Sequence, residues 1–218
     1  MSDASLPALI FDCDGVLIDS EYLASRVESD VTRDLGLKLS VDEAHDMFLG
    51  KTVEGVLDAI AARTGTRPSS TWVYNWAFAT AHAFMRELKA VDGVGVAVEV
   101  LRRRGHRMAV ASQSPLARVR LSLQVAGLAG QFGDHIYVAS MVARPKPAPD
   151  IYLLAAERLG AAPQECIVIE DSPAGASAAQ AAGMRVLGYA PGDSAAAMQT
   201  SGVRVIRSMH ELIAAIEG

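Results

Sequence analysis

The sequence contains only two cysteines, Cys13 and Cys166, and they lie far apart in the chain. Neither belongs to a Cys-x-x-Cys pair, which argues against a disulfide framework and against a cysteine metal site. The five histidines show no paired spacing of the kind that binds zinc. Thiolate and paired-imidazole chemistry is therefore not indicated, and we expect both thiols to be free and buried.

Long apolar runs and an excess of basic residues are also missing. No segment approaches the about 20 apolar residues that span a bilayer, and residues 1–7 lack the basic and apolar regions of a secretory leader. The net charge is −5, which argues against nucleic acid or an anionic membrane as the main partner. We expect a cytoplasmic protein, a monomer or weak homodimer, without nucleic-acid or membrane partners.

The remaining composition is that of an ordinary globular protein. The chain has 218 residues, of which 50% are hydrophobic and 21% charged, enough for one α/β domain or a core with a smaller insert. Residues 20–88 read as helices only, and we call this segment the cap. From residue 89 onward, short apolar runs alternate with helical patterns, ending with a small helix near 195–198 and a last one at 209–216. This alternation predicts a parallel sheet with both faces covered, built from residues 1–19 and 89–218.

The first apolar run, residues 9–11, ends abruptly in acidic residues. Asp12 and Asp14 follow it directly, and Gly15 supplies the backbone freedom for a turn. The run is long enough for a buried strand and too short for a helix. Ligands bind beyond the carboxyl ends of strands in open α/β sheets, so these acids stand where a site is expected. The alternative is a strand followed by a solvated acidic turn.

Later strand ends carry further polar residues, which would meet the first ones at one edge of the sheet. These are Ser112 and Gln113, Lys146, and Glu170 with Asp171. Four carboxylates in one cleft need a cation, because two unit charges 4 Å apart repel by about 4 kcal/mol at an effective dielectric near 20. Oxygen ligands without nearby His or Cys suit Mg²⁺, and a hard cation beside a lysine and a hydroxyl suits a phosphate.

This set of residues allows a division of roles in phosphoryl transfer. Asp12, at the end of the strand, can act as the nucleophile and form a phospho-aspartyl intermediate. Asp14 can protonate the leaving oxygen and later deprotonate water. Each residue also has a simpler interpretation: Ser112 as a helix cap, Lys146 as a solvated loop residue, and Glu170 with Asp171 as acids in the first turn of a helix.

The four ordered motifs resemble those of the haloacid dehalogenase superfamily of phosphotransferases. They are Asp12-Cys13-Asp14-Gly15-Val16, Ser112, Lys146, and Glu170-Asp171-Ser172-Pro173-Ala174-Gly175. The resemblance covers nearly the whole chain and implies a Rossmann-like core with an inserted α-helical cap. It implies Mg²⁺ bound by the Asp12 carboxylate, the Asp14 carbonyl and Asp171, with Glu170 in or near that shell. It also implies that Ser112, with Gln113 beside it, and Lys146 bind the transferring phosphate.

Within the superfamily, the chain is most similar to the beta-phosphoglucomutase-like subgroup of sugar-phosphate phosphatases. Dehalogenases lack the second motif aspartate, here Asp14. Many subgroup members carry a histidine where this chain has Ala24, and the mutase carries an arginine after the cap glycine, where this chain has Lys51. We therefore expect a phosphatase acting on a small phosphorylated metabolite, similar to 6-phosphogluconate or other sugar-phosphate phosphatases. A mutase and a non-catalytic binding protein of the same fold are the alternatives.

The cap is expected to select the substrate, since it closes over a core that handles only the phosphoryl group. Lys51 is our candidate contact to the anionic or hydroxylated end of the substrate, and the alternative is an exposed loop lysine. Trp72 and Trp76 lie four residues apart on one helix face, and we expect them to pack in the cap core rather than to stack on a sugar.

Overall fold

The computed structural model describes residues 6–191, 198 and 202–218. Its main sheet has six parallel strands in the order β5-β4-β1-β6-β7-β8, which confirms the predicted parallel sheet. The strands are β1 (Ala8–Phe11), β4 (Met108–Ser112), β5 (Ile136–Val138), β6 (Cys166–Glu170), β7 (Arg185–Tyr189) and β8 (Arg204–Ile206). Because β1 pairs with β4 on one side and β6 on the other, the polar ends of these three strands are neighbours.

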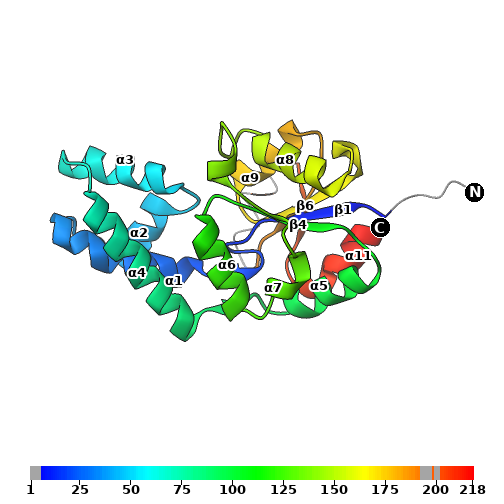
Figure 1. Ribbon diagram of the computed structural model, residues 1–218, viewed down its shortest axis with the longest axis horizontal. Coiled ribbons are helices and arrows are strands. Elements are labelled where there is room, and N and C mark those ends of the chain that lie inside the picture. The colour runs from blue at the N-terminus through cyan, green and yellow to red at the C-terminus, as the bar shows by residue number, and fades with distance from the viewer. Residues whose placement is uncertain (1–5, 192–197, 199–201) are drawn as a thin grey trace, which may run out of the picture.

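Both faces of the sheet are covered by helices, as Figure 1 shows. Every residue of β1 is buried, and the residues alternate between the faces. Ala8 and Ile10 pack with α8 (Asp150–Leu159) and α9 (Pro173–Ala181). Leu9 and Phe11 belong to the core on the opposite face, which includes α5 (Val94–Arg103) and α11 (Leu212–Glu217). Burial on both faces explains why the strand is apolar throughout.

The cap consists of four helices that lie to one side of the sheet (Figure 1). They are α1 (Glu21–Thr32), α2 (Val41–Phe48), α3 (Val53–Thr64) and α4 (Ser70–Glu87). The last three begin with Ser40, Thr52 and Ser69, whose hydroxyls each accept a hydrogen bond from the amide three residues later. These caps satisfy amides that have no partner within the helix, so the helix starts follow from local sequence.

A pair of short antiparallel strands joins the cap to the core, and the sequence did not predict it. The strands β2 (Ile18–Asp19) and β3 (Lys89–Ala90) pair where the chain enters and leaves the cap. The Val91 amide extends the pairing by donating to the Leu17 carbonyl at 3.1 Å. Strands of two residues are too short to show periodicity. This strand pair lies at the proposed boundaries between cap and core, at residues 19–20 and 88–89.

Two further helices lie between β4 and β5. The helix α6 (Leu116–Val125) begins directly after Pro115, which occupies its N-cap position, and α7 (Ala129–Phe132) is a single turn. Single 3-10 turns cover Arg33–Leu35, Ala139–Met141, Pro163–Glu165 and Met209–Glu211. The small helix expected near 195–198 falls almost entirely outside the described residues. Among the described helices, none combines the length and apolar character needed to cross a bilayer.

Candidate active site

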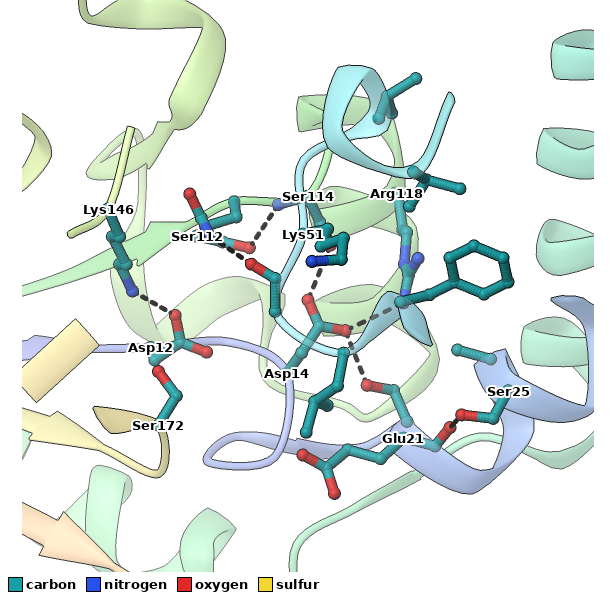
Figure 2. Close-up of a pocket in the computed structure, with 18 of the residues that line it drawn as sticks. Asp12, Asp14, Glu21, Ser25, Lys51, Ser112, Ser114, Arg118, Lys146 and Ser172 are labelled. Atoms are coloured by element: carbon teal, nitrogen blue, oxygen red, sulfur yellow. Dashed lines mark hydrogen bonds and ion pairs between the residues drawn. The ribbon is translucent and has the colours of Figure 1, made fainter. Parts of the chain in front are cut away.

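The predicted site residues meet at one cavity between the sheet edge and the cap. The cavity has a volume of about 180 Å³, and Asp12, Ser112, Lys146 and Asp171 line its core side. Figure 2 shows Lys146 pointing at Asp12, with Asp14 nearer to the cap helices. The parallel register places these residues together although the chain separates them by up to 159 positions, from 12 to 171.

Lys146 is the cation at the centre of the buried cluster. Its Nζ donates to Asp12 Oδ1 at 2.5 Å, to Glu170 Oε1 at 2.7 Å and to the Ala111 carbonyl at 3.0 Å. Burial alone would lower the pKa of Lys146, but the adjacent Asp12 and Glu170 carboxylates outweigh it and hold the pKa well above its ordinary value. The interpretation of Lys146 as a solvated loop lysine is wrong, because its side chain is 3% exposed.

Glu170 positions Lys146, and both of its carboxylate oxygens accept hydrogen bonds. Oε1 accepts from Lys146 and from the Tyr152 hydroxyl at 2.9 Å, while Oε2 accepts from the amide and hydroxyl of Ser172. Burial would raise the pKa of Glu170, but Lys146 and Ser172 together lower it. With all these contacts made within the protein, Glu170 is placed to orient the lysine, and its role as a metal ligand stays a prediction.

Asp171 is a carboxylate without a partner. No hydrogen bond or ion pair to its side chain occurs among the described residues, and its oxygen Oδ2 lies 1.8 Å from where a Cβ at Gly15 would be. Burial, with Glu170 and Asp12 nearby, holds the pKa of Asp171 well above its ordinary value. Burial also outweighs Lys146 and raises the pKa of Asp12 to about 8. Lys146 alone therefore does not neutralise this group of acids.

The uncompensated acids fit a hard divalent cation. No group of three or more His, Cys, Asp or Glu side chains is arranged to hold a metal in the part of the chain that the structure describes. The donor set expected here is the carboxylates of Asp12 and Asp171 and the Asp14 backbone carbonyl, with Glu170 in or near the shell. Oxygen donors of this kind are those that Mg²⁺ prefers.

Asp14 faces a different set of partners from Asp12. Its Oδ1 accepts from the Ser20 hydroxyl at 2.6 Å and from Arg118 at 3.2 Å, and its Oδ2 accepts from the Ser114 hydroxyl at 2.8 Å. Burial would raise the pKa of Asp14, but Arg118 and the two hydroxyls outweigh it and lower the pKa. In this arrangement Asp14 is held ionised.

Arg118 and Ser114 are site residues that the sequence reasoning missed. Ser114 follows β4, and Arg118 lies four residues later in the first turn of α6, so their closeness to the end of β4 could have placed both at this edge. The Arg118 guanidinium also lies over the Phe84 ring of α4, 4.9 Å from its centroid. Arg118 therefore connects the core acid to the cap.

Ser112 and Gln113 follow β4 at the cavity wall. The Ser112 hydroxyl is buried and accepts from the Ser114 amide at 3.0 Å, which leaves its own hydrogen free to donate. The Gln113 side chain donates to the Gly50 carbonyl, so it joins the core to the cap. Lys51, the expected cap contact, lines the cavity and is among the side chains labelled in Figure 2.

The four motifs are thus assembled in space as well as in order, and a family model described as a haloacid dehalogenase-like hydrolase matches residues 6–183. The chain belongs to this family. Hexitol phosphatase B of Escherichia coli K12 is 36% identical over 180 residues, covering 82% of this chain and 81% of that protein. The 6-phosphogluconate phosphatase of the same strain is 28% identical over 182 residues, covering 83% and 81%.

Two further proteins are similar to this chain, and one of them is a solved structure. A family hydrolase from Deinococcus radiodurans, solved with bound phosphate and sodium, has a TM-score of 0.78 at 37% identity, with coverage of 98% of this chain and 96% of that one. SUPPRESSOR OF QUENCHING 1, a chloroplastic protein of Arabidopsis thaliana, is 34% identical over 205 residues, 92% of this chain. The chain spans only 19% of the length of that relative.

Helices α1 and α4 contribute part of the cap wall of this hydrolase. Ala24, Ser25 and Glu28 line the cavity from successive turns of α1, and Trp76 lines it from α4. Glu28 is only 8% exposed. Burial outweighs the attraction of Arg118 and, with Asp14 nearby, raises the pKa of Glu28 to about 7. The sequence reasoning missed Glu28, because nothing in a helical pattern marks it as buried.

Proposed function

We propose that this chain is a Mg²⁺-dependent phosphatase that hydrolyses a small phosphorylated metabolite, a sugar phosphate or sugar-acid phosphate. The observation that carries the proposal is Lys146, buried between Asp12 and Glu170 at the end of β1, in the cavity that Ser112 also lines. A buried ammonium and a hydroxyl at one point suit a phosphoryl group. The named phosphatases among its relatives support the same reaction class, phosphoric monoester hydrolysis.

The residues divide the reaction into two displacements. An Asp12 carboxylate oxygen attacks phosphorus, the ester P–O bond breaks, and the leaving alkoxide takes a proton from Asp14. A water molecule then attacks the phospho-aspartate while Asp14 takes its proton, which restores Asp12 and releases inorganic phosphate. Lys146 and Ser112 hold the phosphoryl oxygens throughout. Bound Mg²⁺, held by Asp12, the Asp14 carbonyl and Asp171, supplies positive charge that lowers the repulsion between carboxylate and phosphate.

The acid role of Asp14 requires a change of partners. Arg118, Ser20 and Ser114 all stabilise its ionised form in the structure, so Asp14 must separate from Arg118 and take up a proton from solvent before it can protonate the leaving oxygen. Ser20 begins the cap and Arg118 contacts the cap ring of Phe84. Movement of the cap over the substrate is therefore coupled to the state of the acid.

Water, and not a second sugar oxygen, accepts the phosphoryl group in this proposal. Ala24 lines the cavity where many subgroup members have a histidine, and Lys51 replaces the arginine of the mutase. Conversion of beta-glucose 1-phosphate to the 6-phosphate without release of phosphate would favour the mutase instead.

The test is phosphate release from a panel of sugar, polyol and sugar-acid phosphates with added Mg²⁺. The Asp12→Asn variant is expected to lose at least about a thousandfold in kcat, since it lacks the nucleophile. Asp19→Asn, an equivalent change at an exposed position of β2, serves as the control and keeps wild-type turnover. Full activity of Asp12→Asn, or full activity after chelation of Mg²⁺, would contradict the proposal. Mg²⁺ binding without turnover of any ester would support the non-catalytic alternative.

A further inference from the structure

Buried polar atoms without hydrogen-bond partners occur on several side chains that line the cavity. Four buried side-chain atoms lack a hydrogen-bond partner among the described residues: Trp76 Nε1, Gln113 Oε1, Arg118 Nε and Ser122 Oγ. The first three belong to residues that line the cavity. A buried polar atom without a partner is costly and uncommon in native proteins. Their concentration at one cavity indicates groups that a ligand completes.

Trp76 differs in this respect from its neighbour Trp72. The two rings pack together, with centroids 5.6 Å apart, and both are buried in the cap as expected. The Trp72 indole donates to the Val31 carbonyl at 3.0 Å, and this residue does not line the cavity. Trp76 does line it, and its indole nitrogen has no partner. The indole N–H of Trp72 is therefore used within the cap, whereas the indole N–H of Trp76 is unused.

Glu28 adds an acceptor to the same wall. Its carboxylate is 8% exposed and makes no hydrogen bond among the described residues. Ala24 and Ser25, one turn earlier on α1, have small side chains that leave space in front of it. The nearby cation, Arg118, attracts the Glu28 carboxylate without an ion pair between them, because it is paired with Asp14 and packed on Phe84.

We propose that Glu28 and Trp76 bind hydroxyl groups of a phosphorylated polyol, whose far end is uncharged. The same two residues disfavour substrates whose far end is a carboxylate. The inference rests on the proposed function and names the substrate class. A hydroxyl both donates and accepts, so it can satisfy the Trp76 donor and the Glu28 acceptor. A carboxylate in the same place only accepts, and it repels the Glu28 charge. The cations Lys51 and Arg118, which also line the cavity, favour the opposite preference.

The experiment compares two esters that share the phosphate and differ at the far end, sorbitol 6-phosphate and 6-phosphogluconate. At about pH 8, above the pKa of Glu28, wild-type kcat/KM is expected to favour the sorbitol ester by about tenfold or more. Glu28→Gln keeps the size of the side chain and one acceptor oxygen but removes its charge, so this ratio should fall about tenfold. Asp30→Asn, an exposed change on α1, should leave the ratio unchanged.

Two tryptophan variants separate binding from packing. Trp76→Phe and Trp72→Phe lose the same volume, but only the first should raise KM for the sorbitol ester, by about two- to tenfold. Trp72→Phe should melt at the lower temperature, since it leaves the Val31 carbonyl without its donor. An equal effect of both variants on KM would assign Trp76 to packing and overturn its role.

Calorimetric binding of the two esters to Asp12→Asn distinguishes failure of the subsite from failure of the proposed function. Preference of the wild type for 6-phosphogluconate, or an unchanged ratio in Glu28→Gln, overturns the inference and leaves the phosphatase function intact. Tighter binding of the sorbitol ester without turnover by the wild type would support the subsite and refute the phosphatase.

Discussion

Arg118 donates to the carboxylate of Asp14 at 3.2 Å, across 104 residues of sequence. The contact joins helix α6 of the core to the residue that we expect to move the proton. Because the same guanidinium lies over the Phe84 ring of the cap, three parts of the molecule meet at this side chain. Substitution of Arg118 tests how much this contact contributes to stability.

Removal of Arg118 should destabilise the fold. The side chains of Arg118 and Asp14 are 23% and 27% exposed, so both are mostly buried. Arg118→Met therefore leaves the Asp14 carboxylate without its cation. We expect the free energy of unfolding to fall by about 1–3 kcal/mol, measured by urea denaturation. Arg120→Met, an exposed change on the same helix, should alter it by less than about 0.5 kcal/mol. Equal stability of the two variants would show that the ion pair contributes nothing.

Gly15 and Gly36 provide a matched pair for testing the metal site. Both have a left-handed backbone, with φ of 77° and 76°, but a Cβ at Gly36 meets nothing within 4 Å, whereas one at Gly15 overlaps Asp171. Gly36→Ala should cost about 1 kcal/mol from the backbone alone.

Gly15→Ala should also displace Asp171. We expect the Mg²⁺ concentration that gives half-maximal activity to rise at least about tenfold, as for other changes beside metal ligands. This concentration is measured by following phosphatase activity as Mg²⁺ is added. If Gly15→Ala and Gly36→Ala require the same Mg²⁺ concentration, Asp171 is not a ligand.

Glu28 should make stability depend on pH. Burial raises its pKa from 4.5 to about 7 in the folded protein, next to Arg118 and Asp14. Between these values the folded state keeps a proton that the unfolded state has lost. The free energy of unfolding therefore falls as pH rises through this window, by at most about 3 kcal/mol, and the contribution is constant above it.

Glu28→Gln removes this titration. Its stability relative to wild type should increase from about pH 5 to about pH 8, when both proteins are unfolded with urea at each pH. Asp30→Asn corrects for general effects of lost charge on α1. Parallel stability curves for Glu28→Gln and wild type would mean that Glu28 is solvated in the folded protein.

Much of the core site could be predicted because it depends on strand ends. The apolar run 9–11 forms β1, and Asp12, Ser112 and Glu170 stand at the ends of three adjacent strands. Parallel pairing alone brings such residues to one edge. Glu170 shows the limit of this reasoning, because its position was predictable but its contacts to Tyr152 and Ser172 were not.

The sequence by itself therefore determined the parallel sheet, the helical cap and the set of acids that meet Lys146, since these follow from apolar periodicity and residue chemistry. Only the tertiary structure decided which side chains are buried and without partners. Glu28 and Trp76 look like ordinary helix residues until α1 and α4 close one wall of the cavity. Burial and pairing depend on neighbours far away in the chain, and no local pattern records them.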